Sequence, residues 1–174
     1  MGMEQMDSDQ HGIPRAESDF ESGLNDDDRL DLRIWLRLLT CANMIERRVR
    51  QNLRMNFDTT LPRFDVLAQI DRSPEGQPMR ELSHRLMVTN GNITPLVDRL
   101  EEDGLVIREP SAKDRRVQHV KLTDAGTAAL DAMIPANKRW VSDLMQHVDR
   151  DRASDLYTLL GDLKESILAS ERDQ

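Results

Sequence analysis

The sequence has one cysteine, few aromatic residues and no long hydrophobic run. Because Cys41 is alone, the chain cannot form an internal disulfide, which is typical of a reducing cytoplasm. Aromatic residues make up only 3% of the chain, so a core has to be built from Leu, Ile, Val and Met. No apolar segment approaches the roughly 18 residues of a membrane span, and the first residues lack the basic and then apolar order of a secretory signal. We therefore expect a cytoplasmic protein with no membrane partner.

Patterns that indicate catalysis or a bound cofactor are also missing. There is no Gly-rich phosphate loop and no nucleophile with a paired base. The histidines are isolated from one another and from other ligand residues, which argues against a metal site: His11, His84, His119 and His147. We therefore predict that the protein is not an enzyme and needs neither a cofactor nor a metal.

The acidic charge is concentrated at the N-terminus. The chain has 32 acidic and 24 basic residues, and residues 1–28 hold nine of the acids against one base. This segment accounts for the whole net charge of -8 and leaves 23 acids and 23 bases in the rest. It is polar and without periodicity, so we predict a disordered acidic tail over residues 1–28. The neutral remainder is compatible with an anionic partner.

Helical periodicity begins at Leu30 and predicts a helix of about 25 residues. After the break NFDTTLP, Thr60 is a candidate N-cap, and Pro62 would lie in the first turn of a helix that ends near Ile70. The segment SPEGQP predicts a turn and RELSHRLM a short helix. A further helix would begin in TNGNITP and end at EEDG, with Gly104 as its C-terminal stop.

The pattern then changes to a β type. LVIRE and VQHVKLT are separated by the basic turn PSAKDRR, and together they predict a two-stranded hairpin. After TDAG the helical period returns in a helix that Pro135 should kink. Beyond a turn at VDRDR, a last helix would carry Leu156 to Ile167. The sequence thus predicts a mainly α chain with a small β-wing.

These elements divide the chain beyond the tail into three parts. Residues 59–123 would form a compact winged helix-turn-helix lobe. The helices of 29–58 and 124–174 each have one apolar stripe and few partners in their own chain to bury it. A second copy of the chain would bury both stripes, so we expect a homodimer with interlocked N- and C-terminal dimerisation helices.

Several segments, in order, resemble the MarR family of bacterial transcription regulators. The similarity covers about residues 30–170 and includes LPRFDVLAQI and MRELSHRLMVTNGNITPLVDRL. Its most specific part is RLEEDGLVIRE followed by KDRR and VKLTDAG, at the family's spacing. The resemblance implies a dimeric winged-helix regulator, usually a repressor and occasionally an activator, that binds a pseudo-palindromic operator. It also implies that a small effector controls binding.

The stretch TNGNITP has residue types suited to reading DNA. The second helix of a helix-turn-helix presents its N-terminal part to base edges in the major groove. There Asn can bond adenine at two atoms, Thr can bond any base, Gly lets the backbone approach phosphate, and Pro offers an apolar surface to a thymine methyl. The alternative is an ordinary capped helix that recognises nothing. The candidate DNA-binding residues are Thr89, Asn90, Gly91, Asn92, Thr94 and Pro95.

The same proline leaves the start of this helix open. Inside a helix, the ring of Pro95 clashes with the carbonyl of Gly91. Either Asn92 caps a helix that begins late, or the helix begins near Thr89 and bends. The family's pattern favours Thr89.

The hairpin tip carries KDRR. In the pattern of the family that it resembles, Arg116 enters the minor groove, whose negative potential attracts a guanidinium. Asp114 would hold that arginine's geometry, and Lys113 or Arg115 would meet phosphate. The alternative is a solvated charged turn.

Two further arginines are candidates for phosphate contacts, Arg85 and Arg99. A structural ion pair between Asp98 and Arg99 is the alternative for the second. The acids that follow, Glu101, Glu102 and Asp103, lie at the far end of the helix and should point away from DNA.

The effector of such a family is commonly an aromatic carboxylate, a phenolic compound or an acyl-CoA thioester, bound where the dimer helices meet the lobe. Side chains that would offer an apolar wall and a partner for an anion are present, although each also fits a dimer core or a solvated helix face. They are Trp35, Met44, Arg47, Arg48 and Trp140.

Two alternative functions are open. A redox-sensing regulator would use Cys41, because some relatives sense peroxides through a cysteine in the first helix. Their position falls on Leu36 here, and Cys41 better fits a small helix-packing residue. A winged-helix module that binds protein instead of DNA is the other alternative, and it would make Arg116 dispensable.

Overall fold

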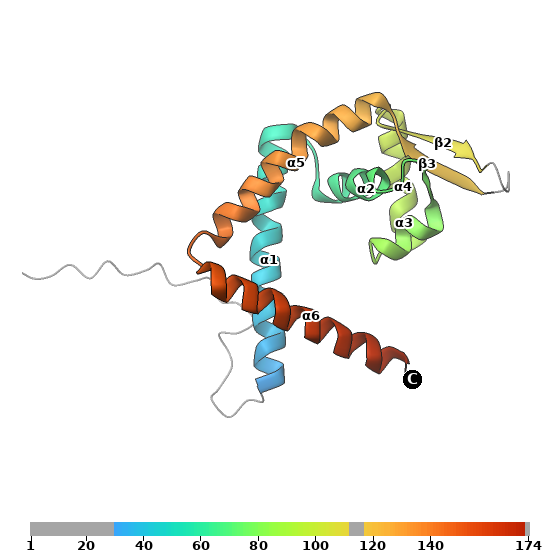
Figure 1. Cartoon of the computed structure of the whole chain (residues 1–174). Coiled ribbons are helices and arrows are strands. Elements are labelled where there is room, and N and C mark those ends of the chain that lie inside the picture. The colour runs from blue at the N-terminus through green and yellow to red at the C-terminus, as the bar shows by residue number, and fades with distance from the viewer. Residues whose placement is uncertain (1–29, 112–116, 173–174) are drawn as a thin grey trace, which may run out of the picture. The chain divides into compact units, whose positions relative to one another are not determined.

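The computed structural model of the protein describes residues 30–111 and 117–172 (Figure 1). Helices predominate over a small antiparallel sheet, which confirms the predicted fold class. The chain divides into two compact units, Met1–Glu46 and Arg47–Gln174. The elements are α1 (Leu30–Phe57), α2 (Leu61–Asp71), β1 (Gln77–Pro78), α3 (Met79–Arg85), α4 (Asn90–Glu102), β2 (Val106–Pro110), β3 (Gln118–Leu122), α5 (Asp124–Met145) and α6 (Arg150–Arg172).

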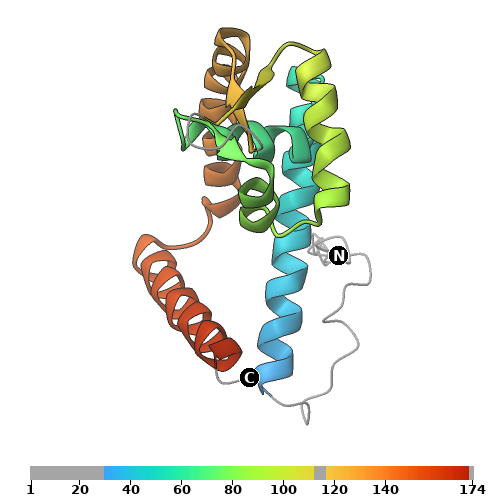
Figure 2. The same ribbon diagram turned by 90° about the vertical axis from the view of Figure 1, so that its right-hand side faces the viewer.

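Helices α2, α3 and α4 form a lobe in which they pack against one another and against the sheet (Figure 2). The core of this lobe consists of apolar residues at positions that periodicity marks on these elements. Their exposed fractions are 1% or less for Leu67, Ile70, Leu82, Ile93, Val97, Leu100, Val106 and Val120. Burying such side chains stabilises the lobe by about 1.5–3 kcal/mol each.

Helix α4 begins early. Thr89 occupies its N-cap position with extended backbone, and its side chain makes no capping hydrogen bond. Its carbonyl accepts instead from the amides of Asn92 at 3.0 Å and Ile93 at 3.2 Å. Pro95 therefore lies inside the helix, where it cannot donate to the carbonyl of Gly91. The start at Thr89 that the family pattern favoured is confirmed, and a cap at Asn92 is wrong.

The sheet has three antiparallel strands in the order β1-β3-β2. The predicted hairpin is confirmed, with Arg108 of β2 opposite Val120 of β3. The strand β1 was not predicted, because the sequence SPEGQP indicated only a turn. Gln77 and Pro78 pair with Val120 and His119.

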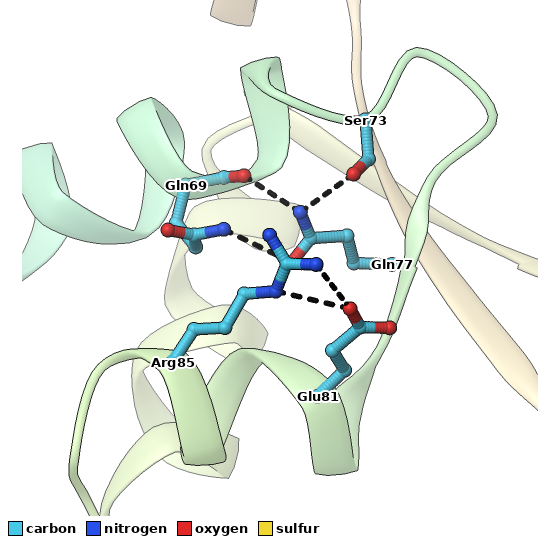
Figure 3. A network of polar contacts seen from close by, with 5 residues as sticks. All are labelled: Gln69, Ser73, Gln77, Glu81 and Arg85. Carbon is cyan, nitrogen blue, oxygen red and sulfur yellow. Dashed lines mark hydrogen bonds and ion pairs between the residues drawn. The ribbon is translucent and has the colours of Figure 1, made fainter. Parts of the chain in front are cut away.

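A buried glutamine explains why this turn continues as a strand (Figure 3). Gln77 is only 1% exposed, and its amide nitrogen donates to the carbonyl of Gln69 at 2.9 Å and to Ser73 Oγ at 2.8 Å. A buried amide requires such partners, and these bonds hold β1 beside α2. Pro78 is tolerated because β1 is an edge strand, where a missing donor can face solvent.

The last helix is longer than the sequence indicated, and the helix before it is continuous. α5 continues through Pro135 to Met145, so the proline does not end it, and the kink stays a prediction. α6 begins at Arg150, inside the segment VDRDR that was expected to be a turn, and none of its residues is buried. Within the described ranges, none of the helices combines the length and apolar character that a membrane crossing requires.

Candidate nucleic-acid interface

Helix α4 has one buried side and one exposed side. Ile93, Val97 and Leu100 are fully buried in the lobe. The other side, together with the N-cap, is exposed and carries the polar residues that the sequence singled out. Of the candidates, Thr89, Gly91, Asn92, Thr94 and Pro95 are exposed, while Asn90 lies in the first turn of the helix and its side chain is outside the described residues. The helix therefore presents a small, polar N-terminus to solvent.

Strand β2 is tied to α4 through Arg108. Its backbone amide donates to Glu101 Oε1 at 3.1 Å, and its guanidinium donates to Glu101 Oε2 and to Asp98 Oδ1. Asp98 and Glu101 are neighbours on the helix at a spacing of three residues, so one arginine can bridge both. The contact fixes the hairpin against the helix whose N-terminus is exposed.

The same contact decides a question that the sequence left open. Asp98 pairs with Arg108 and not with Arg99, so the structural alternative for Arg99 is wrong. Arg99 is exposed on the stripe of α4 that includes Asn92 and Pro95, at spacings of seven and four residues. It remains a phosphate candidate.

Arg85 already has a partner (Figure 3). Its guanidinium donates to Glu81 Oε1 from Nε at 3.0 Å and from a terminal nitrogen at 2.5 Å. Both side chains are 44% exposed, so the pair stabilises the short helix α3 only weakly. A phosphate contact by Arg85 would have to compete with this pair.

The basic tip of the hairpin falls outside the described residues. The strands approach it as expected, and the amide of Ser111 donates to the carbonyl of Val117 at 2.8 Å. The four candidates between them are among the residues that the structure does not describe: Lys113, Asp114, Arg115 and Arg116.

The candidate effector residues are distributed over both units. Trp35 and Met44 belong to the first unit and are 58% and 56% exposed. Arg47 and Arg48 are exposed at the start of the second unit. There, Trp140 packs edge-on against Phe57, with the ring centroids 6.1 Å apart.

Phe57 is a residue that the sequence analysis missed. Its place at the end of a helical run offered no sign of a contact with a residue more than 80 positions away. The pair supplies an aromatic surface between α1 and α5, and edge-to-face packing of this kind adds about 0.5–1.5 kcal/mol beyond area burial.

The structure describes the environment of Cys41 and the spacing of residue types that bind metals over residues 30–111 and 117–172. Cys41 is exposed among the described residues, so its role as a helix-packing residue stays a prediction. Over residues 30–111 and 117–172, no group of three or more His, Cys, Asp or Glu side chains is placed to hold a metal ion.

Comparison with known proteins gives consistent matches. The family model described as the MarR family matches residues 59–117. An HTH-type transcriptional regulator of Bacillus cereus is 31% identical over 135 residues, which cover 77% of this chain and 88% of the relative. The crystal structure of a MarR family transcriptional regulator from Silicibacter pomeroyi aligns with a TM-score of 0.68 at 31% identity, covering 79% of this chain and 94% of that one. A second regulator, from Streptomyces coelicolor and solved in complex with DNA, aligns with a TM-score of 0.70 at 23% identity over 82% and 92% of the two chains.

Proposed function

The chain belongs to the MarR family of transcriptional regulators, and we propose that it represses transcription by binding a pseudo-palindromic operator as a homodimer in the bacterial cytoplasm. The observation that carries the proposal is the exposed polar N-terminus of α4. A helix that buries its apolar side in a lobe and presents Asn, Thr and Gly to solvent fits the major groove, where such residues reach base edges. The regulator from Streptomyces coelicolor was solved in complex with DNA, which supports this use of the fold.

In this proposal each exposed position of α4 has its own role. Thr89, Asn90, Asn92 and Thr94 would bond base edges, and Gly91 would admit the backbone close to a phosphate. Pro95 would face the groove with its apolar ring. Further along the same stripe, Arg99 would meet phosphate.

The hairpin would enter the adjacent minor groove. Arg116 would be inserted there, with Asp114 holding its geometry and Lys113 or Arg115 on phosphate. The bond of Arg108 to α4 supports this role, because it fixes the base of the hairpin relative to the recognition helix.

The homodimer would be built from the helices at the two ends of the chain. Helix α6 exposes Leu156, Leu160, Leu163 and Ile167 along one stripe. A stripe of this kind is stable in water only when something covers it, and a second copy is the partner that a two-fold operator requires. The two recognition helices would then lie about one turn of DNA apart.

A small organic effector, such as an aromatic acid or an acyl-CoA thioester, would release the operator. The aromatic pair Phe57–Trp140 supplies an apolar wall in the second unit, and Arg47 and Arg48 lie on the same helix as Phe57. Trp35 and Met44, the other two candidates, belong to the first unit. Addition of benzoate-type acids and of acyl-CoA thioesters to the DNA complex tests this, and a complex that no such compound dissociates would count against it.

Selection from random duplex DNA tests the proposal as a whole. We expect a palindrome whose half-sites are about one helical turn apart. With six or more phosphate contacts per dimer, affinity for it should fall about 1,000-fold between roughly 50 and 200 mM salt. A salt-insensitive complex, or no enriched sequence, would favour the protein-binding alternative.

A substitution at Arg116 distinguishes operator binding from the protein-binding alternative most directly. If the hairpin enters the minor groove, Arg116→Ala should weaken operator binding by about tenfold or more, since a charged contact is lost in each subunit. The variant should keep the melting temperature and the oligomeric state of the wild type. Unchanged affinity in a gel-shift titration would contradict the wing assignment.

A further inference from the structure

The turn between α3 and α4 contains a residue in an unfavourable conformation. The amide of Val88 donates to the carbonyl of Ser83 at 3.0 Å, and the amide of Met87 donates to the carbonyl of His84 at 3.2 Å. These two bonds form the Schellman motif that ends many helices. Its left-handed position is usually a glycine, but here it is Met87, with a φ of 53°.

Folding within the chain does not explain a methionine at this position. A left-handed residue with a Cβ is strained, and Met has no polar side chain that could bond locally to offset the strain. Met87 is also 95% exposed, so it buries almost nothing in exchange. The only other non-glycine residue with positive φ in the described ranges is Asp58, a residue type that tolerates this region better. Strained residues without a structural benefit point to a function outside the fold.

Met87 lies next to the proposed base-reading residues. It is two positions before Thr89, so their Cα atoms are at most about 7 Å apart. Met87, Val88, Thr89, Gly91 and Asn92 are all exposed. A flexible methionine side chain can therefore reach the part of the DNA that the N-terminus of α4 would contact.

We propose that Met87 is a specificity-determining residue that contacts a thymine methyl group in the major groove. The inference rests on the proposed operator binding. An exposed thioether side chain has no donor to offer to phosphates or base acceptors. The C5-methyl group of thymine is the apolar group that the base edges present in the major groove, and apolar side chains contact it in sequence-specific complexes.

Replacing thymine by uracil removes only this methyl group. The probe is the duplex that the full-length wild-type protein selects from random DNA, synthesised with uracil at one thymine position in both half-sites at a time. At the contacted position, uracil should weaken wild-type binding by about fourfold per methyl group, and so by about tenfold or more per dimer.

Two glycine variants complete the test. Met87→Gly should melt at the same or a higher temperature, because glycine relieves the strain, yet it should bind the thymine operator about tenfold more weakly and lose its sensitivity to uracil at that position. Asp58→Gly makes the same backbone change at the other strained position, and its affinity should match that of the wild type.

The outcomes are distinguishable. If Met87→Gly binds as tightly as the wild type, loses affinity while keeping its response to uracil at every position, or is matched by an equal loss in Asp58→Gly, the inference is wrong while operator binding stands. If the wild type enriches no sequence, the proposed function fails and the inference fails with it.

Discussion

Two glycines in the first turns of helices differ in what a Cβ atom would contact. At Gly126, in the first turn of α5, a Cβ would lie 2.0 Å from the carbonyl oxygen of Leu105. At Gly91, in the first turn of α4, a Cβ would meet only Thr89 Oγ1, at 3.9 Å. The first glycine is required by the fold. The second is not, so its reason would lie in what approaches α4 from outside.

Gly126→Ala should therefore be a folding mutation. Thr123 holds the N-terminus of α5 close to the backbone at Gly104. Its hydroxyl donates to the carbonyl of Gly104 at 2.7 Å and accepts from the amide of Gly126 at 3.0 Å. The clash is with backbone, which cannot move aside cheaply, and we expect a loss of about 3 kcal/mol, at the upper end of overpacking costs. Thermal unfolding measures it, and a melting temperature within a degree of the wild type would contradict the packing described.

Gly91→Ala should behave in the reverse way. Alanine is favoured over glycine inside a helix by about 1 kcal/mol, so the variant should be at least as stable as the wild type. Its methyl group would hold the helix away from a phosphate, and loss of a hydrogen bond to a charged group corresponds to about a tenfold drop in operator affinity. A gel-shift titration beside a melting curve checks both. Equal affinity would show that the backbone at Gly91 does not approach DNA.

Among the elements, α4 and the hairpin must act together if both enter DNA. Arg108 connects them by bonding two carboxylates of α4 with a side chain that is 22% exposed. Its partners are 48% and 37% exposed, so solvent screens the pair and its contribution to stability is modest. Its importance would lie in geometry, since it fixes where the hairpin leaves the helix.

Arg108→Met keeps the length of the side chain and removes the connection. We expect a stability loss of about 1 kcal/mol and a larger effect on binding, about tenfold or more, because the hairpin would no longer hold its arginine in place. Arg63→Met is a matched control: Arg63 is 21% exposed and pairs with Asp103 at 2.5 Å, so it connects α2, and not the hairpin, to the C-cap of α4. A similar loss of affinity in both variants would mean that the ion pairs act on stability alone.

At the scale of the whole molecule, the exposed apolar residues of α6 are the feature that the fold leaves to be explained. Most of α6 is exposed, including a stripe of leucines that is hydrophobic enough for a core. The proposed dimer resolves this, and a two-fold axis would also place the two α4 helices for a palindrome.

Leu163→Glu places a charge in this stripe and should shift the protein from dimer to monomer, with loss of operator binding, because a charge cannot be buried unpaired at an interface. Thr158→Glu adds the same charge on the opposite face of α6 and should leave the dimer intact. Analytical ultracentrifugation distinguishes them. A wild type that sediments as a monomer at micromolar concentration would remove the basis of the proposed function.

The local parts of this protein follow from the sequence alone. Helical periodicity identified the buried side of α4 and therefore its exposed polar side, and alternation with turn residues identified the hairpin, because these signals depend on neighbours within a few positions. The proline in TNGNITP showed only that the helix start was unusual. The residues alone left the start undecided, and the resemblance to a family favoured Thr89.

Contacts between distant segments were decided by the tertiary structure. The strand β1 forms because Gln77 is buried beside α2. Asp98 forms its ion pair with Arg108 and not with Arg99. Phe57 packs against Trp140, which is 83 positions away in the sequence. The strain at Met87 likewise appears only in the folded backbone. No periodicity encodes such pairs, since each depends on how packing brings together side chains that the sequence keeps apart.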